Sequence, residues 1–174
     1  MFANPLKILK QFGVADDMIV VDLGAGSGFY SIPLAQMVSN GKVYSVEIQK
    51  DFLKTIKNKA DESGLHNIDF IWGDVEKKEG TKLKKEIVDR VLASNILFQI
   101  NDKHKFADEI GRILKKGGKL LLIDWLEDKK IFNSKDNKHF EKREAVAFFG
   151  EKGFILEREI DVGGHHYGII LIKK

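Results

Sequence analysis

The chain has 174 residues, no cysteine and a net charge of +3, with 43% hydrophobic and 32% charged residues. This composition excludes disulfide-stabilised domains, thiolate metal sites, cysteine nucleophiles and disordered chains, and it predicts one globular domain. No apolar run approaches the about 20 residues of a membrane span.

The first half of the chain alternates amphipathic segments with short apolar ones. Residues 1–13 are typical of an amphipathic helix. The β-branched run at 18–23 is typical of a strand that is buried on both faces, as in a parallel sheet. The same patterns predict helices over 27–39 and 51–64, and strands over 42–48 and 67–74.

The second half continues the alternation and ends in a hairpin. The short glycine turn 161–164 separates two strands, so these are expected to pair antiparallel. A chain of strands that are mostly followed by helices predicts an α/β sandwich with a mainly parallel sheet. We expect one domain over 1–174, with a helix at 1–13 and an α/β core at 18–174. The expected elements of this half are helices at 81–86, 103–118 and 138–153, and strands at 87–94, 119–125, 154–160 and 165–173.

Three glycines follow the first strand in the segment VVDLGAGSGFY, residues 20–30. They lie between a strand and a helix, where glycine permits unusual φ angles and leaves the backbone bare for a ligand. The dinucleotide fingerprint G-x-G-x-x-G fails here, because Phe29 occupies the sixth position, and no phosphate-binding P-loop string is present. The spacing is D-x-G-x-G-x-G, and its leading acid, Asp22, suits a cationic group better than a pyrophosphate.

Acids end three successive predicted strands. Asp22 ends the first, Glu47 ends the second 23 positions after Gly24, and Asp74 ends the third. In an open α/β sheet the ligand lies beyond the carboxyl ends of the strands, so these carboxylates should share one side of a crevice. Glu47 is placed to accept from both hydroxyls of a ribose, and Asp74 from an exocyclic amine.

Together the segments VVDLGAGSG, VYSVEI, WGDV, DRVLASNILFQI and ILKKGGKLLLIDW resemble the successive motifs of class I S-adenosylmethionine-dependent methyltransferases of the small UbiE-like kind. The resemblance covers nearly the whole chain; Lys116 stands where the last motif usually has proline. It implies a Rossmann-like sandwich with a seven-stranded sheet in the order 3-2-1-4-5-7-6, the last strand antiparallel, and S-adenosyl-L-methionine as cofactor, with S-adenosylhomocysteine as product. The expected cofactor-binding residues are Asp22, Gly24, Ala25, Gly26, Gly28, Glu47, Ile48, Gly73, Asp74, Val75 and Ser94.

The acceptor of the methyl group is expected on the other half of the sheet, because the first three strands serve the donor. We predict Asn95, Asp124 and His166 as the catalytic residues, with His165 and Tyr167 as further candidates. Neighbouring residues on a strand point to opposite faces, so at most one of the two histidines can face the crevice, and no metal site is expected. Phe98 and Trp125 are candidates for the lining of an acceptor pocket.

A small-molecule acceptor is preferred over a nucleic acid. The lysine-rich stretches at 57–59 and 82–85 have acids nearby and are interpreted as solvated helix faces. Residues 94–97, Ser-Asn-Ile-Leu, also lack the prolines of the [N/D]-P-P-[aromatic] string found in enzymes of this fold that modify base amines.

Two other functions stay open. The chain is compatible with a non-catalytic S-adenosylmethionine-binding subunit. An NAD-dependent oxidoreductase is disfavoured by the glycine spacing and by the lack of a Tyr-x-x-x-Lys pair. The first 13 residues lack the long uncharged core of a signal peptide, which predicts a cytoplasmic protein.

Overall fold

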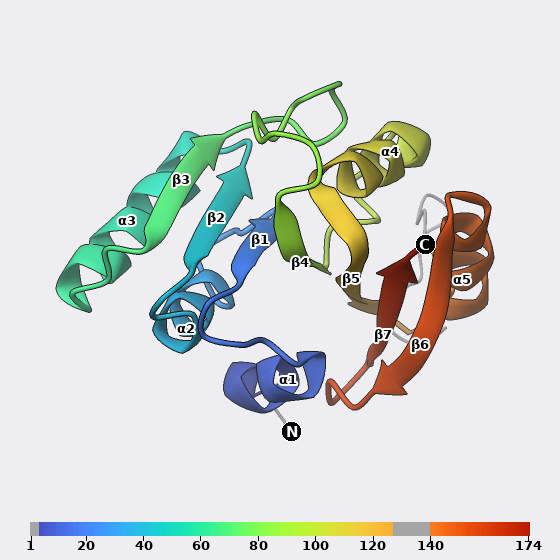
Figure 1. Cartoon of the computed structure of the whole chain (residues 1–174), viewed down its shortest axis with the longest axis horizontal. Coiled ribbons are helices and arrows are strands. Elements are labelled where there is room, and N and C mark those ends of the chain that lie inside the picture. Colours follow the sequence, from blue (N-terminus) through green and yellow to red (C-terminus); the bar gives the residue numbers. More distant parts are fainter. Residues whose placement is uncertain (1–3, 127–139) are drawn as a thin grey trace.

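A computed structural model describes residues 4–126 and 140–174 of the chain (Figure 1). The strands are β1 (Ile19–Leu23), β2 (Lys42–Glu47), β3 (Ile68–Trp72), β4 (Val88–Ser94), β5 (Leu114–Trp125), β6 (Phe154–Ile160) and β7 (His166–Lys173). The helices are α1 (Pro5–Phe12), α2 (Ser31–Met37), α3 (Lys50–Glu62), α4 (Lys103–Ile113) and α5 (Lys142–Glu151).

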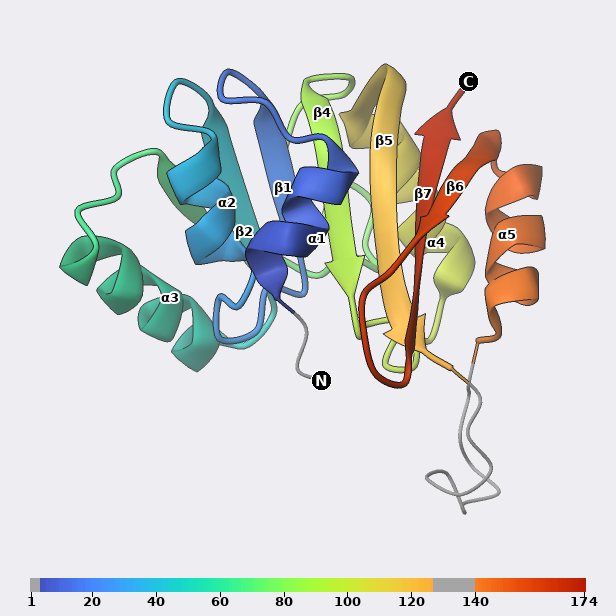
Figure 2. The same ribbon diagram turned by 90° about the horizontal axis from the view of Figure 1, so that it is seen from below.

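All strands of the described ranges join one sheet in the order β3-β2-β1-β4-β5-β7-β6, which confirms the predicted topology. Strands β1 to β5 pair parallel to their neighbours among themselves, whereas β7 is antiparallel to both β5 and β6. In Figure 2 the arrowheads of β4 and β5 lie at one end of the sheet and that of β7 at the other. The carboxyl ends of β1 to β5 therefore share one edge, where ligands bind in open α/β sheets.

Helices cover both faces of the sheet (Figures 1 and 2). On one face α1, α2 and α3 contribute Ile8, Leu34 and Ile56 to a buried core. On the other face α4 and α5 contribute Phe106 and Phe149 to a second core. Because β1 and β4 lie between the two layers, their apolar side chains are buried on both faces, as their continuous hydrophobic runs predicted.

The helix predicted over 81–86 is wrong, because this segment folds as irregular turns. Lys82 and Glu86 have φ angles of 58° and 55°, which an α-helix cannot contain. Tertiary contacts decide this conformation. Thr81 donates through its backbone N–H and its hydroxyl to Glu109, and Glu86 N donates to Arg112 O of α4.

Two other predicted helices extend too far. The helix over 27–39 spans only Ser31–Met37, and its start is delayed because Gly28, inside the predicted range, has a φ of 85°. The helix over 103–118 ends at Ile113, and β5 begins at the next residue. Leu114 already pairs with Val88 of β4, and this pairing ends the helix before the glycines.

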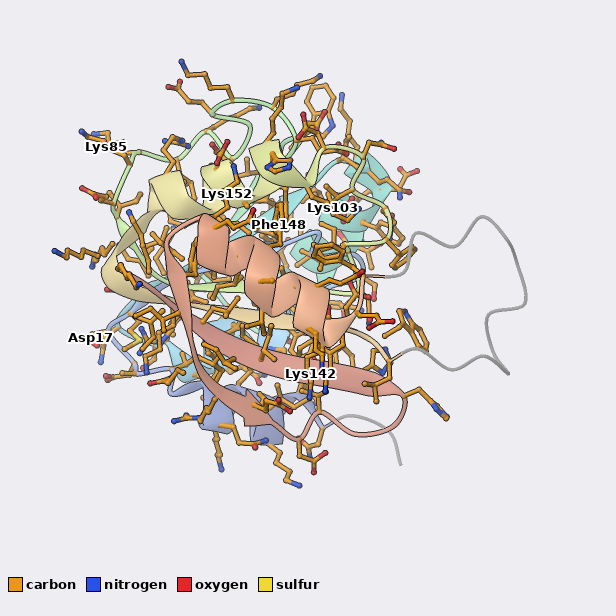
Figure 3. The ribbon with its side chains drawn as sticks, turned by 90° about the vertical axis from the view of Figure 1, so that its right-hand side faces the viewer. Asp17, Lys85, Lys103, Lys142, Phe148 and Lys152 are labelled. Atoms are coloured by element: carbon orange, nitrogen blue, oxygen red, sulfur yellow. The ribbon has the colours of Figure 1, made fainter. Side chains whose placement is uncertain are left out.

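The last helix, predicted over 138–153, is α5; residues 138–139 lie outside the described ranges. Ion pairs fasten both ends of α5 to its neighbours. Lys142 Nζ lies 2.7 Å from Glu159 of β6, and Lys152 Nζ lies 2.7 Å from Asp108 of α4 (Figure 3). The Phe148 ring of α5 packs edge-on against the His104 ring of α4, which is a direct contact between the two helices.

Among the helices in the described parts of the chain, none is both long enough and apolar enough to cross a membrane.

Candidate functional site

A cavity of about 700 Å³ opens at the carboxyl ends of the parallel strands. Residues from the ends of β1, β2 and β4 and from the turns that follow them line it, together with Val162 and His166 from the terminal hairpin. Of the cofactor-binding residues and the three catalytic residues predicted from the sequence, all but Gly28 and Asp124 line this cavity. The residues that do are Asp22, Gly24, Ala25, Gly26, Glu47, Ile48, Gly73, Asp74, Val75, Ser94, Asn95 and His166.

The glycine loop is held against the end of β2. The backbone N–H groups of Gly24 and Ala25 donate to Val46 O at 2.9 and 3.2 Å. Gly24 has a φ of 67°, and a Cβ atom there would overlap the Ile96 side chain. The loop therefore approaches the segment after β4 more closely than any residue with a side chain would permit.

Gly28 does not line the cavity and instead allows close packing against α3. A Cβ atom at Gly28 would lie 3.1 Å from Ile56 Cγ1 of α3, and φ there is 85°. Because Gly28 does not line the cavity, its role in cofactor binding stays a prediction. The third glycine lets the loop pass beneath α3 and turn into α2.

Glu47 fastens the loop to the sheet. Its Oε2 accepts from Gly26 N at 2.9 Å, and its Oε1 accepts from Ile48 N and Gln49 N at 2.9 and 3.0 Å. The side chain is buried, with a relative exposure of 7% for the residue. Glu47 thus satisfies three backbone donors at the position where β2 ends and the cavity begins.

Asp22 lies at the base of the cavity and is 3% exposed. Its Oδ2 accepts from Ser31 Oγ at 2.6 Å, and Ser31 Oγ accepts in turn from Ser45 Oγ at 2.8 Å. Burial, with a smaller contribution from the charge of Glu47, raises the pKa of Asp22 to about 6 against the opposing hydrogen bonds from Ser31. Burial likewise raises the pKa of Tyr30, which also lines the cavity, to about 12.

Asp74 lines the opposite side of the cavity beyond β3. Its Oδ1 accepts from Glu76 N at 3.0 Å, and its Oδ2 lies 3.5 Å from Lys77 Nζ. Ile48 stands nearby at the end of β2 and is 57% exposed. This part of the site joins a carboxylate acceptor to an uncovered apolar surface, a combination that suits a flat base with an exocyclic amine.

Asn95 and His166 line the half of the cavity beyond β4. Asn95 follows β4 with a φ of 54°, and its backbone N–H donates to Ile123 O at 2.8 Å. The His166 ring lies 4.1 Å from the Trp125 ring, centroid to centroid, across the β5–β7 pairing. Burial, and secondarily the charge of His165, lower the pKa of His166.

Several predicted acceptor residues lie elsewhere. Asp124 does not line the cavity; its Oδ2 accepts from Leu97 N at 3.1 Å and its Oδ1 from Trp125 N at 2.8 Å. It anchors the turn after β4, and its predicted catalytic role is not supported by its position. Tyr167 is also turned away, since its hydroxyl donates to Phe140 O at 3.0 Å. The three other candidates that do not line the cavity are His165, Phe98 and Trp125.

Sequence reasoning missed part of the lining. Phe29 and Phe52 lie at the cavity with exposures of 51% and 37%, and Gln99 and Val162 also line it. The position of Phe29 at the cavity could have been inferred from the sequence, because this large apolar residue replaces the last glycine of a dinucleotide fingerprint. The position of Val162 could not be inferred from the sequence, because it depends on how the hairpin loop folds over Gly168.

A model of the family described as a methyltransferase domain matches residues 15–167. The chain belongs to this family. The result confirms the family that the motifs predicted. Among the described residues, no group of three or more histidine, aspartate or glutamate side chains is arranged to hold a metal ion.

Known proteins resemble this methyltransferase domain in fold or in part of their sequence. The crystal structure of a SAM-dependent methyltransferase from Aquifex aeolicus has a TM-score of 0.88 and 26% identity, covering 99% of this chain and 91% of that one. The C-methyltransferase UbiE of Wigglesworthia glossinidia brevipalpis, from ubiquinone/menaquinone biosynthesis, is 31% identical over 63% of this chain. Arsenite methyltransferase of Mus musculus is 30% identical over 60% of it. The matched regions cover only 43% and 30% of those two curated relatives.

Proposed function

We propose that this methyltransferase domain transfers the methyl group of S-adenosylmethionine to a small-molecule acceptor. The observation that carries the proposal is the convergence of Asp22, Glu47 and Asp74 on one cavity. Each carboxylate ends or follows a different strand, and the bare backbone of Gly24 and Gly26 lies among them. This arrangement offers acceptors for hydroxyl, amino and cationic groups at separate positions.

The residues present fit the donor. A cavity of about 700 Å³ falls within the range of ligand pockets, roughly 300–1,000 Å³. Asp74 and Ile48 suit an adenine, Glu47 a ribose, and Asp22 with the glycine backbone the charged methionine part. S-adenosylmethionine supplies an electrophilic methyl group on a sulfonium, and loss of that methyl group leaves a neutral thioether.

Glu47 has room for one further hydrogen bond. A carboxylate offers about four lone-pair sites. Oε1 uses two for Ile48 N and Gln49 N, and Oε2 uses one for Gly26 N. In this conformation Glu47 would therefore accept from one ribose hydroxyl on Oε2, whereas the sequence suggested two.

The protein contributes placement and charge. In-line transfer requires the acceptor atom to be held close to the donor carbon with water excluded. Ser94 and Asn95 lie between the donor half of the cavity and the half formed with the terminal hairpin. The acceptor would therefore approach along β4 and β5 and meet the donor over these two residues.

The preference for a small-molecule acceptor draws support from the relatives. Their names give a quinone-pathway C-methyltransferase and an arsenite methyltransferase. The absence of an Asn-Pro-Pro string after β4 adds support against a base amine.

The test has two stages. Calorimetry should detect binding of S-adenosylmethionine and S-adenosylhomocysteine but not of NAD; the reverse result would end the proposal. Formation of S-adenosylhomocysteine is then measured with cell extract that has been filtered to remove macromolecules. Turnover with the filtrate supports a small-molecule acceptor, whereas turnover only with the retained fraction, abolished by nuclease or protease, would contradict it.

A further inference from the structure

Two buried polar atoms beside the cavity have no hydrogen-bond partner. They are Asn95 Oδ1 and His166 Nε2, and among the described residues only Arg90 Nε shares this condition. Arg90 does not line the cavity, whereas Asn95 and His166 both do. Leaving a buried polar atom unpaired costs free energy, which a ligand that supplies the missing partner recovers.

The sheet brings these two residues to one place. Asn95 follows Ser94, which pairs with Ile123 of β5, and His166 pairs with Trp125 on the other side of β5. Ile123 lies two residues before Trp125 on the same face, and it lines the cavity. Asn95 and His166 thus flank the end of β5 from both sides.

Both atoms are suited to accept a hydrogen bond. An amide oxygen only accepts, and a neutral imidazole keeps one nitrogen without a proton. The lowered pKa of His166, caused first by burial, keeps its ring neutral near pH 7. Both residues line the cavity, but the two atoms themselves are covered in the present conformation. Contact with a ligand therefore requires a rotation of the Asn95 amide and of the His166 ring.

The surroundings of the two atoms are apolar. Ile96, Ile100, Ile123 and Val162 line the same cavity. Val162 reaches it because the hairpin loop folds over Gly168, where a Cβ atom would overlap Val162 Cγ1. A ligand in this half of the cavity would therefore need an apolar body with one polar group.

We propose that the methyl acceptor presents an O–H or N–H group on an apolar body to Asn95 Oδ1 and His166 Nε2, and that His166 takes the proton. This inference rests on the proposed function. A hydroxyl can direct its proton at either atom, and a primary amine can direct one at each. Carboxylates and other groups without a proton are disfavoured, because they would place a lone pair against Asn95 Oδ1.

The step balances as follows for an acceptor X–H. The X–H proton moves to His166 Nε2, and the electron pair on X forms the bond to the methyl carbon. The carbon–sulfur bond breaks, and its electron pair stays on the sulfur of the thioether product. His166 then returns the proton to solvent.

Binding of matched probes tests the proposal without reference to turnover. The probes are 4-ethylphenol with 4-ethylanisole, and 4-ethylaniline with N,N-dimethyl-4-ethylaniline, because each pair differs in the proton-bearing group. Affinities are measured by NMR titration of the ¹⁵N-labelled protein with S-adenosylhomocysteine present. We expect at least one proton-bearing probe to bind at least fivefold more tightly than its methylated partner, with shifts at Asn95 and His166. The two pairs separate O–H from N–H acceptors.

Variants connect the preference to the two residues. His166→Phe keeps a ring against Trp125 but removes the nitrogen, and Asn95→Gly removes the amide while tolerating the positive φ. Each should reduce the preference to less than twofold. His165→Phe is the matched control, because His165 is exposed and outside the cavity lining, and it should keep the wild-type preference.

The outcomes separate this inference from the proposed function. If calorimetry shows that S-adenosylhomocysteine does not bind, the proposed function fails. If it binds, but both probe pairs are bound equally or not at all at millimolar concentration, only the present inference is overturned. A preference that survives in both His166→Phe and Asn95→Gly also overturns it.

Discussion

Glu47 Oε2 accepts a hydrogen bond from Gly26 N at 2.9 Å, joining the end of β2 to the tip of the glycine loop. Together with the bonds from Ile48 N and Gln49 N, this contact makes Glu47 a structural anchor as well as a candidate ligand residue. Its substitution should therefore affect both stability and donor affinity.

Replacing Glu47 with alanine should weaken S-adenosylmethionine binding at least tenfold, because a charge-assisted hydrogen bond contributes about 1.5–3 kcal/mol. The unliganded protein should also lose roughly 1–3 kcal/mol of unfolding free energy, since three backbone donors lose their acceptor. Calorimetry and urea unfolding measure the two effects. Glu62→Ala, an exposed residue at the end of α3, is the control and should change neither. Unchanged affinity in Glu47→Ala would place the ribose elsewhere.

Asp22 should make stability fall as pH rises. Its folded pKa of about 6 lies above the ordinary 3.8, so folding favours the protonated carboxyl. The contribution is present in full below about pH 4 and is lost as pH rises through about 6, for a total of roughly 3 kcal/mol. Asp22→Asn does not titrate, so its unfolding free energy relative to wild type should rise between pH 4 and pH 7.5. Urea unfolding at both pH values checks this, and a constant difference would contradict it.

Donor affinity should have the opposite pH dependence. The cationic methionine part of S-adenosylmethionine is attracted by ionised Asp22, so binding should tighten as pH rises through about 6. Calorimetry at pH 5.5 and 7.5 should show this change in wild type and a smaller one in Asp22→Asn. If donor affinity changes with pH equally in wild type and in Asp22→Asn, a titratable group other than Asp22 causes the change.

Gly24 and Gly64 form a matched pair for testing the close approach of the glycine loop. Their φ angles are 67° and 64°, but a Cβ atom at Gly24 would overlap Ile96 Cδ1, whereas at Gly64 nothing lies within 4 Å. Gly64→Ala should cost about 1 kcal/mol from the backbone alone. Gly24→Ala should cost at least about 1 kcal/mol more and also weaken donor binding.

Removing the overlapping atom should rescue part of this loss. Ile96→Val deletes Cδ1, so the double variant Gly24→Ala/Ile96→Val should recover stability relative to Gly24→Ala. The free energies of unfolding of wild type, Gly24→Ala, Gly64→Ala and the double variant are compared by chemical unfolding. Equal costs for Gly24→Ala and Gly64→Ala would show that the loop is not packed as closely as described.

Asn95 adopts a φ of 54°, and this determines how it should be substituted. Asparagine and glycine tolerate this region, whereas alanine does not. Asn95→Ala should therefore be about 1 kcal/mol less stable than Asn95→Gly, although both lack the amide. If the two variants unfold at the same urea concentration, the positive φ is not maintained in solution.

The alternation of strands and helices and the acids at three strand ends could be predicted from the sequence, because they depend on local pattern. Parallel strands bring their carboxyl ends to one edge, so Asp22, Glu47 and Asp74 had to converge once the fold was known. The glycine spacing alone likewise excluded a dinucleotide loop, because Phe29 occupies the position of its last glycine.

Other features needed the tertiary structure. Asp124 and His166 both lie near the strand ends that form the acceptor half, yet only His166 lines the cavity. Neighbouring residues on a strand point to opposite faces of the sheet, so a shift of one position changes the face to which a side chain points. β5 also begins at Leu114, five residues earlier than its pattern predicted. The segment 81–86 has helical residue types, but Glu109 and Arg112 hold it in turns. The sequence by itself determined which chemical groups reach the edge of the sheet; packing and register decided which of them face the cavity.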